Sequence, residues 1–515
     1  MITYTDYEII SRKVNSYIMT ERRDYHQHDG ERDPFFASRY EKILALRELG
    51  INIYPDSFER THISTEILSD PEVVGREVSV AGRISSIRNI GKLSFAHIQD
   101  FGGQIQILLR VDELGEDSLR LFRGYFDIGD FVGVKGEVFV TRTGETTVLT
   151  NNIGMLSKAL RPPPEKYHGL KNREVILRQP YLDLLSNPES REKFVIRANV
   201  IKTIRNYLDN NGFIEVETPI LQSESSGANA KPFITRYDAL DADFYLRIAP
   251  ETYLKRLLVG GYERVYEIGR NFRNEGVDSS HLQQFTMLEF YAAYWNAFAN
   301  LNFTESLLRE VIKRSTSDKT VKVEDKEFHW EDEWPRRTYR DVVLEHSGVD
   351  FYAVHGLDDL REKIAGTGIS LPNADTMNLP QLMEKWFKLT TRPFLVEPQF
   401  IVEYPKDLSP LARESDSKPG FVDQFQFIVG GSEIVKGYSE LIDPVEQRQR
   451  LLRQVELREE GDQETMPLDS DYLLAMEYGM PPNSGVGIGI DRLVAIITGS
   501  SSLRDVVLFP TVRPK

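Results

Sequence analysis

Glycine occupies every second position in the segment GVGIGIDR, residues 485–492. Residues two apart share a face of a strand, so Gly485, Gly487 and Gly489 would leave one face as bare backbone. The branched apolar residues between them would anchor the opposite face in the core. A flat ring could then lie on the bare face under Arg492, since guanidinium groups stack on aromatic bases. A helix packed tightly over the glycines is the alternative, and the alternation together with the arginine favours the ligand.

Charged residues recur at a two-residue spacing in RVYEIGRNFRNEGVDSSHLQQFTMLEFYAAYW, residues 264–295. The pattern predicts two strands around a polar loop, with Arg273 and Glu275 on one face of the first and Glu289 and Tyr291 on the second. An arginine beside a loop histidine suits a polyphosphate, because guanidinium binds phosphate oxygens in a bidentate manner. A salt-bridged surface hairpin is the alternative, but the apolar flanks place the hairpin in the core sheet, where charged groups are usually paired or functional.

Two further observations concern a nucleotide site. The segment KFVIRANVIKTIRNYLDNNGFIEVETPIL, residues 193–221, predicts a helix that ends near Asn211 and a strand that ends at Pro219, which alone is an ordinary helix–strand unit. The chain has neither a G-x-x-x-x-G-K-[ST] loop nor a strand-leading G-x-G-x-x-G. ATP would therefore bind on an open antiparallel sheet rather than at a Rossmann crevice.

The composition excludes several classes of protein. Of the 515 residues, 40% are hydrophobic and 28% are charged, an ordinary balance for globular proteins. No cysteine is present, which excludes disulfides, thiolate zinc sites and a cysteine nucleophile. The net charge of −16 argues against a protein that simply coats nucleic acid. The N-terminus lacks a secretory signal and no apolar run reaches the roughly 18 residues of a membrane span, so we expect a cytoplasmic protein without membrane contact.

Changes in periodicity predict three parts of the chain. Residues 1–65 are predicted to form a polar helical extension, and residues 66–160 short antiparallel strands of the size of an OB-fold barrel. The proline-rich segment LRPPPEKYHGL ends this barrel, and residues 161–515 mix long helices and strands as one large α+β domain. A polar, helix-rich stretch within that domain, residues 315–395, is predicted to be an inserted subdomain.

Taken together, the three stretches resemble motifs 1, 2 and 3 of the class II aminoacyl-tRNA synthetases, and the lysyl-tRNA synthetase family in particular. RIAPETYLKRLLVGGYERVYEIGRNFRNEG, IVEYPKDLSPLAR and GIGIDRLVAIITGSSSLRDVVLFPTVRP are similar to the bacterial enzymes, and GKLSFAHIQDFGGQIQ to their anticodon-binding domain. The resemblance runs from about residue 36 to the end of the chain. It implies an α+β fold, with an N-terminal OB-fold β-barrel followed by a class II catalytic domain, an antiparallel sheet flanked by helices.

The resemblance implies an activity as well as a fold. Lysine and ATP would form lysyl-adenylate and pyrophosphate, with Mg²⁺ as cofactor, and the lysyl group would then pass to the terminal ribose of tRNA(Lys) with release of AMP. Such chemistry asks the protein mainly for positioning and charge stabilisation. Motif 1, around residues 204–219, implies a homodimer, and two-fold dimers are the commonest soluble oligomers.

Individual residues receive roles from the same resemblance. It places Arg273 between the lysine carboxylate and the α-phosphate, and it implies Arg273, Arg492 and Glu433 as catalytic residues. The implied ATP-binding residues are Arg273, Glu275, His281, Phe285, Glu433, Gly487, Gly489 and Arg492. The implied lysine-binding residues are Gly227, Glu251, Arg273, Glu289, Tyr291, Lys436 and Glu440. The implied anticodon-binding residues are Phe95, Gln99 and Arg88, and the implied Mg²⁺ ligands are Glu433 and Gln426.

The chain departs from the family pattern where phosphates are expected. Gln426 stands where the family usually has glutamate, and Lys436 where it usually has asparagine. Leu282 and Gln284 replace polar or charged residues in the loop of motif 2. The changes at Gln426 and Lys436 both make the phosphate region more positive, which suggests that the Lys436 ammonium stands in for one Mg²⁺ ion and that fewer ions than usual are bound.

These departures leave an alternative. A synthetase paralogue could use lysyl-adenylate for an acceptor other than tRNA, or it could be a regulator with reduced catalysis. Retention of Arg273, Glu275, Glu433 and Arg492 argues against lost catalysis, and the OB-like part argues for a tRNA acceptor. Residues 1–35 lie outside the resemblance.

Overall fold

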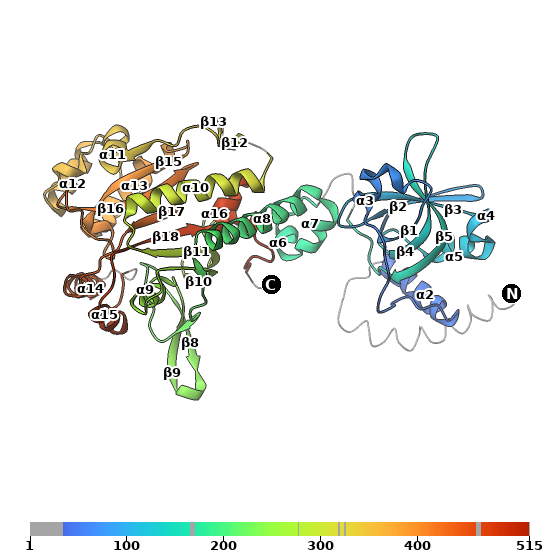
Figure 1. Ribbon diagram of the computed structural model, residues 1–515, viewed down its shortest axis with the longest axis horizontal. Helices are drawn as coiled ribbons and strands as arrows, with labels where there is room; N and C mark the ends of the chain where they lie inside the picture. The colour runs from blue at the N-terminus through green and yellow to red at the C-terminus, as the bar shows by residue number, and fades with distance from the viewer. Residues whose placement is uncertain are drawn as a thin grey trace. The chain divides into compact units, whose positions relative to one another are not determined.

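The computed structural model divides the chain into two compact units, residues 1–169 and 170–515. It describes residues 34–164, 170–276, 278–317, 320–323, 326–459 and 465–513. Most of the predicted N-terminal extension, residues 1–33, lies outside the described residues. Figure 1 shows each unit with its helices and strands labelled.

The first unit is a closed five-stranded barrel with short helices around it. The strand order is β1-β2-β3-β5-β4, with β3 and β5 parallel and the other neighbours antiparallel. Its elements are α2 (Pro34–Glu48), α3 (Ser64–Ser69), β1 (Glu77–Ile90), β2 (Leu93–Gln99), β3 (Gln104–Arg110), α4 (Val111–Leu114), α5 (Glu116–Tyr125), β4 (Phe131–Val140) and β5 (Thr146–Ser157). The alternating pattern of the sequence produces this barrel because every second side chain enters its core, as in β2, where residues 94, 96 and 98 are buried.

A buried lysine near the end of the barrel holds two acidic residues. The Lys158 ammonium donates 2.7 Å to Asp130 Oδ2 and pairs with Asp127, and its side chain is fully buried. Lys42 of α2 also donates to Asp127 Oδ1, at 2.7 Å. These contacts fasten α2 and the C-terminal end of β5 to the same corner of the barrel.

The second unit is built on an eight-stranded sheet of order β14-β15-β16-β17-β18-β11-β10-β6. The strands are antiparallel except for the two edge pairs, β14–β15 and β6–β10, so the sheet is mixed rather than purely antiparallel as predicted. The strands of this unit are β6 (Ile214–Glu215), β7 (Leu221–Gln222), β8 (Phe233–Tyr237), β9 (Ala242–Leu246), β10 (Arg264–Phe272), β11 (Gln284–Ala293), β12 (Thr320–Val323), β13 (Lys326–His329), β14 (Arg336–Thr338), β15 (Gln399–Pro405), β16 (Phe421–Val429), β17 (Ser432–Ser439) and β18 (Asn483–Gly489). With the barrel of the first unit, it confirms the predicted α+β fold class.

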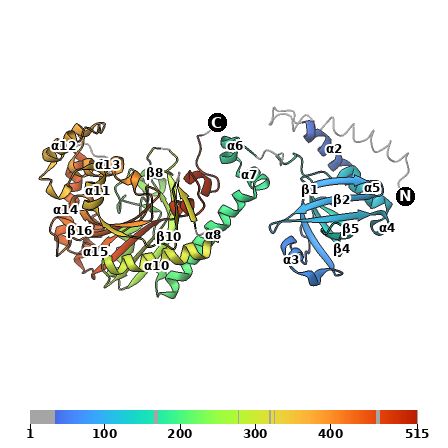
Figure 2. The ribbon, with the colours of Figure 1, turned by 90° about the horizontal axis from the view of Figure 1, so that it is seen from above.

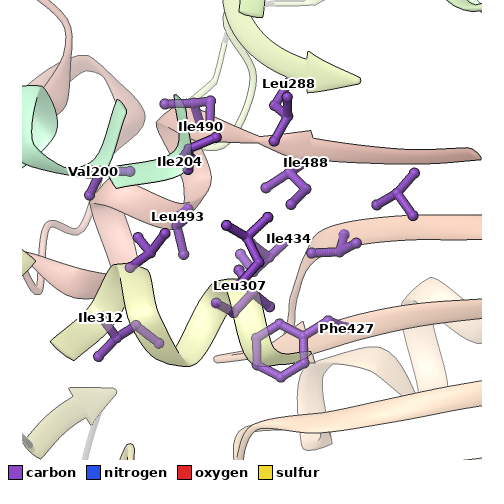
Figure 3. Close-up of a cluster of buried hydrophobic side chains, with 14 of the residues drawn as sticks. Val200, Ile204, Leu288, Leu307, Ile312, Phe427, Ile434, Ile488, Ile490 and Leu493 are labelled. Carbon is purple, nitrogen blue, oxygen red and sulfur yellow. The ribbon is translucent and has the colours of Figure 1, made fainter. Parts of the chain in front are cut away.

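Helices cover one face of this sheet. The helices of the unit are α6 (Arg173–Arg178), α7 (Pro180–Ser186), α8 (Pro188–Asn210), α9 (Glu251–Val259), α10 (Ala297–Ser315), α11 (Tyr339–Ser347), α12 (Leu357–Gly366), α13 (Leu379–Thr390), α14 (Pro444–Glu459), α15 (Ser470–Glu477) and α16 (Ile490–Ile497). The long helices α8 and α10 run side by side in both views (Figures 1 and 2) and are in contact. Figure 3 shows the core between them and the sheet, where Ile204 of α8, Leu307 of α10 and Leu493 of α16 surround Ile488 of β18.

The stretch from residue 315 to 395 contains α11, α12 and α13 together with short strands β12–β14. Its helices enclose a core of their own that includes Tyr339, Leu360 and Trp386 and extends to residues of β15 and β16. The helix α13 thereby reaches the sheet face opposite to α10. Within the described ranges, every helix is too short or too polar to cross a membrane.

Candidate active site

A cavity of about 520 Å³ lies on the sheet face that α10 and α16 leave uncovered. Its walls come from β11, β17 and β18, the loop after β10, the start of α9, and α13. The structure brings all the residues that the sequence assigns to ATP, lysine and metal to this one cavity. They are Gly227, Glu251, Arg273, Glu275, His281, Phe285, Glu289, Tyr291, Gln426, Glu433, Lys436, Glu440, Gly487, Gly489 and Arg492.

The alternating strand β18 separates core from cavity as the two-residue period predicts. Val486 and Ile488 are buried in the core under α10, whereas the three glycines line the cavity. The glycine face is not bare along its whole length, however. A Cβ at Gly485 would lie 2.2 Å from the Tyr291 ring and 2.5 Å from Glu440 Oε1, so protein side chains already cover this position. At Gly489, by contrast, such an atom would meet only the Arg492 side chain, at 3.7 Å.

The turn from β18 into α16 positions Asp491 and Arg492, the last two residues of the glycine-rich segment 485–492. Asp491 belongs to α16, since β18 stops at Gly489. The buried Asp491 carboxylate pairs with Arg197 of α8 at 2.6 Å and accepts a hydrogen bond of 2.8 Å from the Thr286 backbone amide of β11. Asp491 therefore joins three elements, while the next residue, Arg492, points into the cavity and donates to the Glu433 carbonyl oxygen at 2.9 Å.

The hairpin of β10 and β11 carries Arg273, whose side chain is half-buried. Arg273 and Glu275 lie in the loop just after β10, which ends at Phe272, so the prediction that they belong to the strand is wrong. Long-range pairing decides where a strand ends, and the local period does not report it. The Arg273 guanidinium lies 5.0 Å from the centre of the Phe285 ring, and its Nε has no hydrogen-bond partner among the described residues. Burial lowers the pKa of Arg273, although Glu275 opposes the shift. An unpaired buried guanidinium is costly unless an anion binds there.

The loop between β10 and β11 is polar and partly exposed. His281 Nδ1 lies 2.8 Å from Asp278 Oδ2, and Ser280 also donates to Asp278. Burial alone would raise the pKa of Asp278, but the hydrogen bonds from His281 and Ser280 together outweigh it and lower that pKa to about 2. The carboxylate therefore holds the His281 ring at the mouth of the cavity. Leu282, in contrast, turns inward and packs against the core of the sheet.

Three buried carboxylates converge at the other end of the cavity. Glu251 begins α9, Glu289 lies in β11, and Glu440 follows β17. The Tyr291 hydroxyl donates to Glu289 Oε2 at 3.0 Å. Gly227 lies against Glu251 in the left-handed region, with φ of 91°, where a Cβ would come within 3.2 Å of Glu251 Cβ. So many acids in one closed site are suited to a ligand with several ammonium groups.

Lys255, one turn after Glu251 on α9, is a residue of this cluster that the sequence analysis missed. Its ammonium donates to Glu251 Oε1 at 2.6 Å and forms an ion pair with Glu440, and its side chain is fully buried. Glu251 and Lys255 are four residues apart, which is the spacing of an ion pair on one face of a helix, so the sequence could have predicted this contact. The contact with Glu440, 185 residues away, had no local signal.

A different set of side chains forms the wall near β16 and β17. Gln426 and Lys436 are paired across these two strands, and the Tyr404 hydroxyl donates to Gln426 Oε1 at 2.8 Å. Arg392, which follows α13, also lines the cavity and was not predicted. Its side chain makes no hydrogen bond or ion pair in the parts of the chain that the structure describes. Burial lowers the pKa of Arg392 despite the opposing charge of Glu433, and Arg492 adds to the shift.

The ligand set for a metal ion is sparse on this wall. Glu433 supplies a carboxylate, whereas Gln426 supplies an amide oxygen that already accepts one hydrogen bond. No group of three or more His, Asp or Glu side chains suited to a metal ion occurs within the described ranges. Mg²⁺ in nucleotide sites is commonly held by one or two carboxylates together with substrate phosphates, and Glu433 offers such a carboxylate.

The predicted anticodon residues lie on the barrel of the first unit. Phe95 is paired with Arg88 across β1 and β2, and Gln99 lies on the same face of β2 as Phe95. Between them on that face is His97, whose Nε2 lies 2.8 Å from Glu145 Oε1. Glu145 also accepts from Gln106 Nε2 at 2.7 Å, so a polar network that the sequence analysis missed lies on the same face as the half-buried Phe95 ring.

Comparison with known proteins assigns the two units separately. The family description "tRNA synthetases class II (D, K and N)" matches residues 172–513, and "OB-fold nucleic acid binding domain" matches residues 78–156.

Three curated relatives are similar over nearly the whole chain, and each is named "Lysine--tRNA ligase". The protein of Pelotomaculum thermopropionicum is 47% identical over 93% of this chain and 94% of its own length. Those of Carboxydothermus hydrogenoformans and Bacillus cereus are 45% and 44% identical, each over 93% of this chain and 97% of its own length. Because the family match covers well over half of the residues and the relatives are matched almost end to end, the chain belongs to the class II tRNA synthetases of the D, K and N group.

Proposed function

We propose that this protein attaches L-lysine to tRNA(Lys) through lysyl-adenylate. The observation that carries the proposal is the convergence of Glu251, Glu289 and Glu440 in the same cavity as Arg273, whose Nε has no hydrogen-bond partner among the described residues. Carboxylates suit the two ammonium groups of lysine, and a guanidinium suits its carboxylate and the phosphate beside it. The names of the relatives point to the same activity.

The lysine subsite is proposed at the acidic end of the cavity. Glu251, with the backbone around Gly227, holds the α-ammonium group. Glu440 and Tyr291 hold the side-chain ammonium, and Glu289 supports Tyr291 through the hydrogen bond from its hydroxyl. Burial makes these contacts strong, because charge-assisted hydrogen bonds gain in a site without water.

The ATP subsite is proposed over the open end of β18. The adenine ring lies between Phe285 and Arg492, above Gly487 and Gly489, and Glu275 reads its amino group. Arg273 then moves from the face of Phe285, where it lies in the structure, to bridge the lysine carboxylate and the α-phosphate. His281 contacts the phosphates from the loop.

In the first step, an oxygen of the lysine carboxylate attacks the α-phosphorus of ATP and pyrophosphate leaves. Arg273 stabilises the charge that develops on the α-phosphate and holds the two reactants in line. In the second step, the hydroxyl of the terminal ribose of tRNA attacks the lysyl carbonyl carbon and AMP leaves. Mg²⁺, when bound, neutralises phosphate charge, and Glu433 is the residue best suited to hold it.

Fixed cations are proposed to replace part of the metal charge. Lys436 and Arg392 face the cavity without ion-pair partners in the described ranges, next to Glu433 and Gln426. A fixed cation needs no reorganisation when pyrophosphate charge develops. We therefore expect the enzyme to need fewer than three Mg²⁺ ions in each active site.

Recognition of the tRNA and assembly complete the proposal. On the barrel, Phe95 stacks on an anticodon base, and Arg88 and Gln99 hydrogen-bond beside it, as single-stranded bases are commonly read. The segment from α8 to Pro219 forms a homodimer interface. It carries exposed apolar side chains at Ile214 and, just beyond, at Ile220. Sedimentation that gives a stable, active monomer would contradict the dimer.

The activity is tested by ATP–pyrophosphate exchange with each amino acid in turn, followed by charging of tRNA with the amino acid that supports exchange. We expect lysine alone to support exchange and tRNA(Lys) to be charged. Exchange with lysine but no charging of any tRNA would contradict the tRNA acceptor. Absence of exchange with every amino acid would contradict the synthetase activity.

A further inference from the structure

Lys255 is a fully buried ammonium in the floor of the proposed lysine subsite. Its Nζ lies 2.6 Å from Glu251 Oε1, pairs with Glu440, and lies 5.7 Å and 5.8 Å from the ring centres of Tyr438 and Tyr472. Glu251 Oε1 also accepts from the Tyr438 hydroxyl at 2.7 Å. One protein ammonium thus connects the carboxylate proposed for the α-ammonium group with the carboxylate proposed for the side-chain ammonium.

The pairing is incomplete on the side of Glu440. The Lys255 ammonium meets Glu440 at Oε2, whereas Glu440 Oε1, which is also buried, has no hydrogen-bond partner among the residues that the structure describes. A buried carboxylate oxygen left without a hydrogen bond is costly. Buried ion pairs in general add little stability compared with apolar side chains of the same size. The cluster is therefore arranged for a ligand rather than for the stability of α9.

The charges of the cluster match those of free lysine. Glu251, Glu289 and Glu440 carry three negative charges when ionised, and Lys255 neutralises one of them, which leaves two. Lysine brings two ammonium groups, and its single carboxylate meets Arg273. Without Lys255 the site would hold an excess negative charge that the substrate cannot balance.

We propose that Lys255 is a positioning residue for lysine recognition, which fixes the separation of Glu251 and Glu440 and sets the charge of the pocket to match a substrate with two ammonium groups. This inference rests on the proposed function. It assigns Lys255 no contact with the reacting atoms.

The titration of the cluster gives the inference a measurable consequence. The groups that face Lys255 are Glu251 on α9, Tyr438 and Glu440 at the end of β17, and Tyr472 on α15. Beyond Glu440 lie Glu289 and Tyr291 of β11. Burial lowers the pKa of Lys255, but Glu251 and Glu440 outweigh it and hold the pKa well above its ordinary value.

Burial acts in the opposite direction on the pKa values of the neighbouring carboxylates. Burial raises the pKa of Glu440 to about 8, although Lys255 opposes the rise. Burial also raises the pKa of Glu289 to about 8, with Glu251 adding to it. Glu289 and Glu440 therefore bind protons more readily than ordinary carboxyl groups, and an ammonium that binds beside them favours their ionised form. Lysine affinity should rise as the pH rises toward 8, and loss of Lys255 should move that rise to higher pH.

The variant Lys255→Met removes the charge and keeps the unbranched apolar stem. In ATP–pyrophosphate exchange between pH 6 and 9.5, we expect KM for lysine at pH 7.5 to rise at least about tenfold, the effect of one pKa unit. We expect kcat and KM for ATP to change much less, and the fall of lysine KM with pH to shift to higher pH. Lys255→Arg, which keeps the charge, should restore the pH profile in part.

Lys158→Met is the matched control, because Lys158 is also fully buried between two carboxylates but lies in the barrel. It should lower thermal stability without changing the pH profile of lysine KM. A profile of Lys255→Met that superimposes on the wild type, or a shift shared with Lys158→Met, would overturn the inference and leave Lys255 a structural residue.

If Lys255→Met fails to fold, calorimetry on the unaltered protein still tests the inference. Lysine is titrated near pH 7.5 in two buffers of different ionisation enthalpy. The inference expects net proton release, because Glu289 and Glu440 ionise on binding, and binding without proton release overturns it. Absence of lysine binding and of exchange in the wild type would instead contradict the proposed function.

Discussion

Gln426 and Lys436 are directly paired across β16 and β17, so an amide and an ammonium occupy adjoining positions on the wall of the cavity. Directly opposed residues in an antiparallel pair point to the same side of the sheet and interact. Arg392 and Lys388 also line this wall, so that together with Lys436 its three cations outnumber the acids Glu384 and Glu433. Burial would raise the pKa of Glu384, but Lys388, Lys436 and Arg392 outweigh it and lower that pKa. A strongly positive local potential is the expected setting for a triphosphate.

Lys436→Asn is predicted to increase the dependence on Mg²⁺. A hydrogen bond to a charged group contributes about 1.5–3 kcal/mol, so ATP affinity measured by calorimetry in EDTA should fall about tenfold or more. The Mg²⁺ concentration that half-saturates pyrophosphate exchange should rise. Lys385→Asn removes the same charge from an exposed position on α13 outside the cavity and should change neither. A wild-type enzyme that requires three ions cooperatively, with Lys436→Asn unchanged, would contradict the prediction.

Arg392→Gln is predicted to separate the two substrates. Arg392 adjoins Glu433 and Arg492 rather than the acidic cluster, so its loss should raise KM for ATP about tenfold and leave KM for lysine unchanged. Steady-state exchange kinetics with each substrate varied in turn provide the measurement. Arg340→Gln, on an exposed arginine of α11 that pairs with Asp350, controls for a general effect on the inserted helices. An equal rise in both KM values would indicate a distorted cavity instead.

Two glycines of β18, Gly485 and Gly489, are predicted to serve different substrates. A Cβ at Gly485 would collide with Tyr291 and Glu440, so Gly485→Ala should displace both and raise KM for lysine at least about tenfold. Gly489→Val should leave the fold largely intact, because valine suits strands and only the Arg492 side chain is near, yet it should abolish ATP binding. Thermal melts measure the stability of each variant, and separate titrations with lysine and with ATP show which substrate each variant fails to bind. Unfolding of Gly489→Val before any loss of ATP binding would show that this glycine serves packing.

Local periodicity predicted much of this site. The two-residue period of β18 identified Val486 and Ile488 as core residues, because alternation along a strand depends only on its own backbone. The same rule failed at the end of β10, where Arg273 already belongs to the loop. Pairing with a neighbouring strand determines where β10 ends, and the sequence of one segment alone does not reveal that pairing.

Local periodicity could not predict contacts between segments that are distant in the sequence. Tyr291 covers Gly485 because β11 and β18 are neighbours in this register, which only the folded sheet determines. Lys255 of α9 contacts Glu440, which follows β17, and Arg392, which follows α13, enters the cavity. The resemblance to known synthetases gave no role to Lys255 or Arg392, although Lys255 lies in the stretch RIAPETYLKRLLVGG that is similar to the bacterial enzymes.

Phe95→Ala is predicted to impair tRNA charging alone. Stacking of a base on an aromatic ring contributes about 1–3 kcal/mol, so kcat/KM for tRNA should fall roughly tenfold to a hundredfold. Pyrophosphate exchange without tRNA should be unchanged, because Phe95 lies on the barrel and the cavity is formed by residues 227–503 of the second unit. Phe298→Ala, an exposed phenylalanine of α10, should affect neither measurement. If Phe95→Ala charges tRNA(Lys) as well as the wild type does, the exposed face of β1 and β2 is not where the anticodon is read.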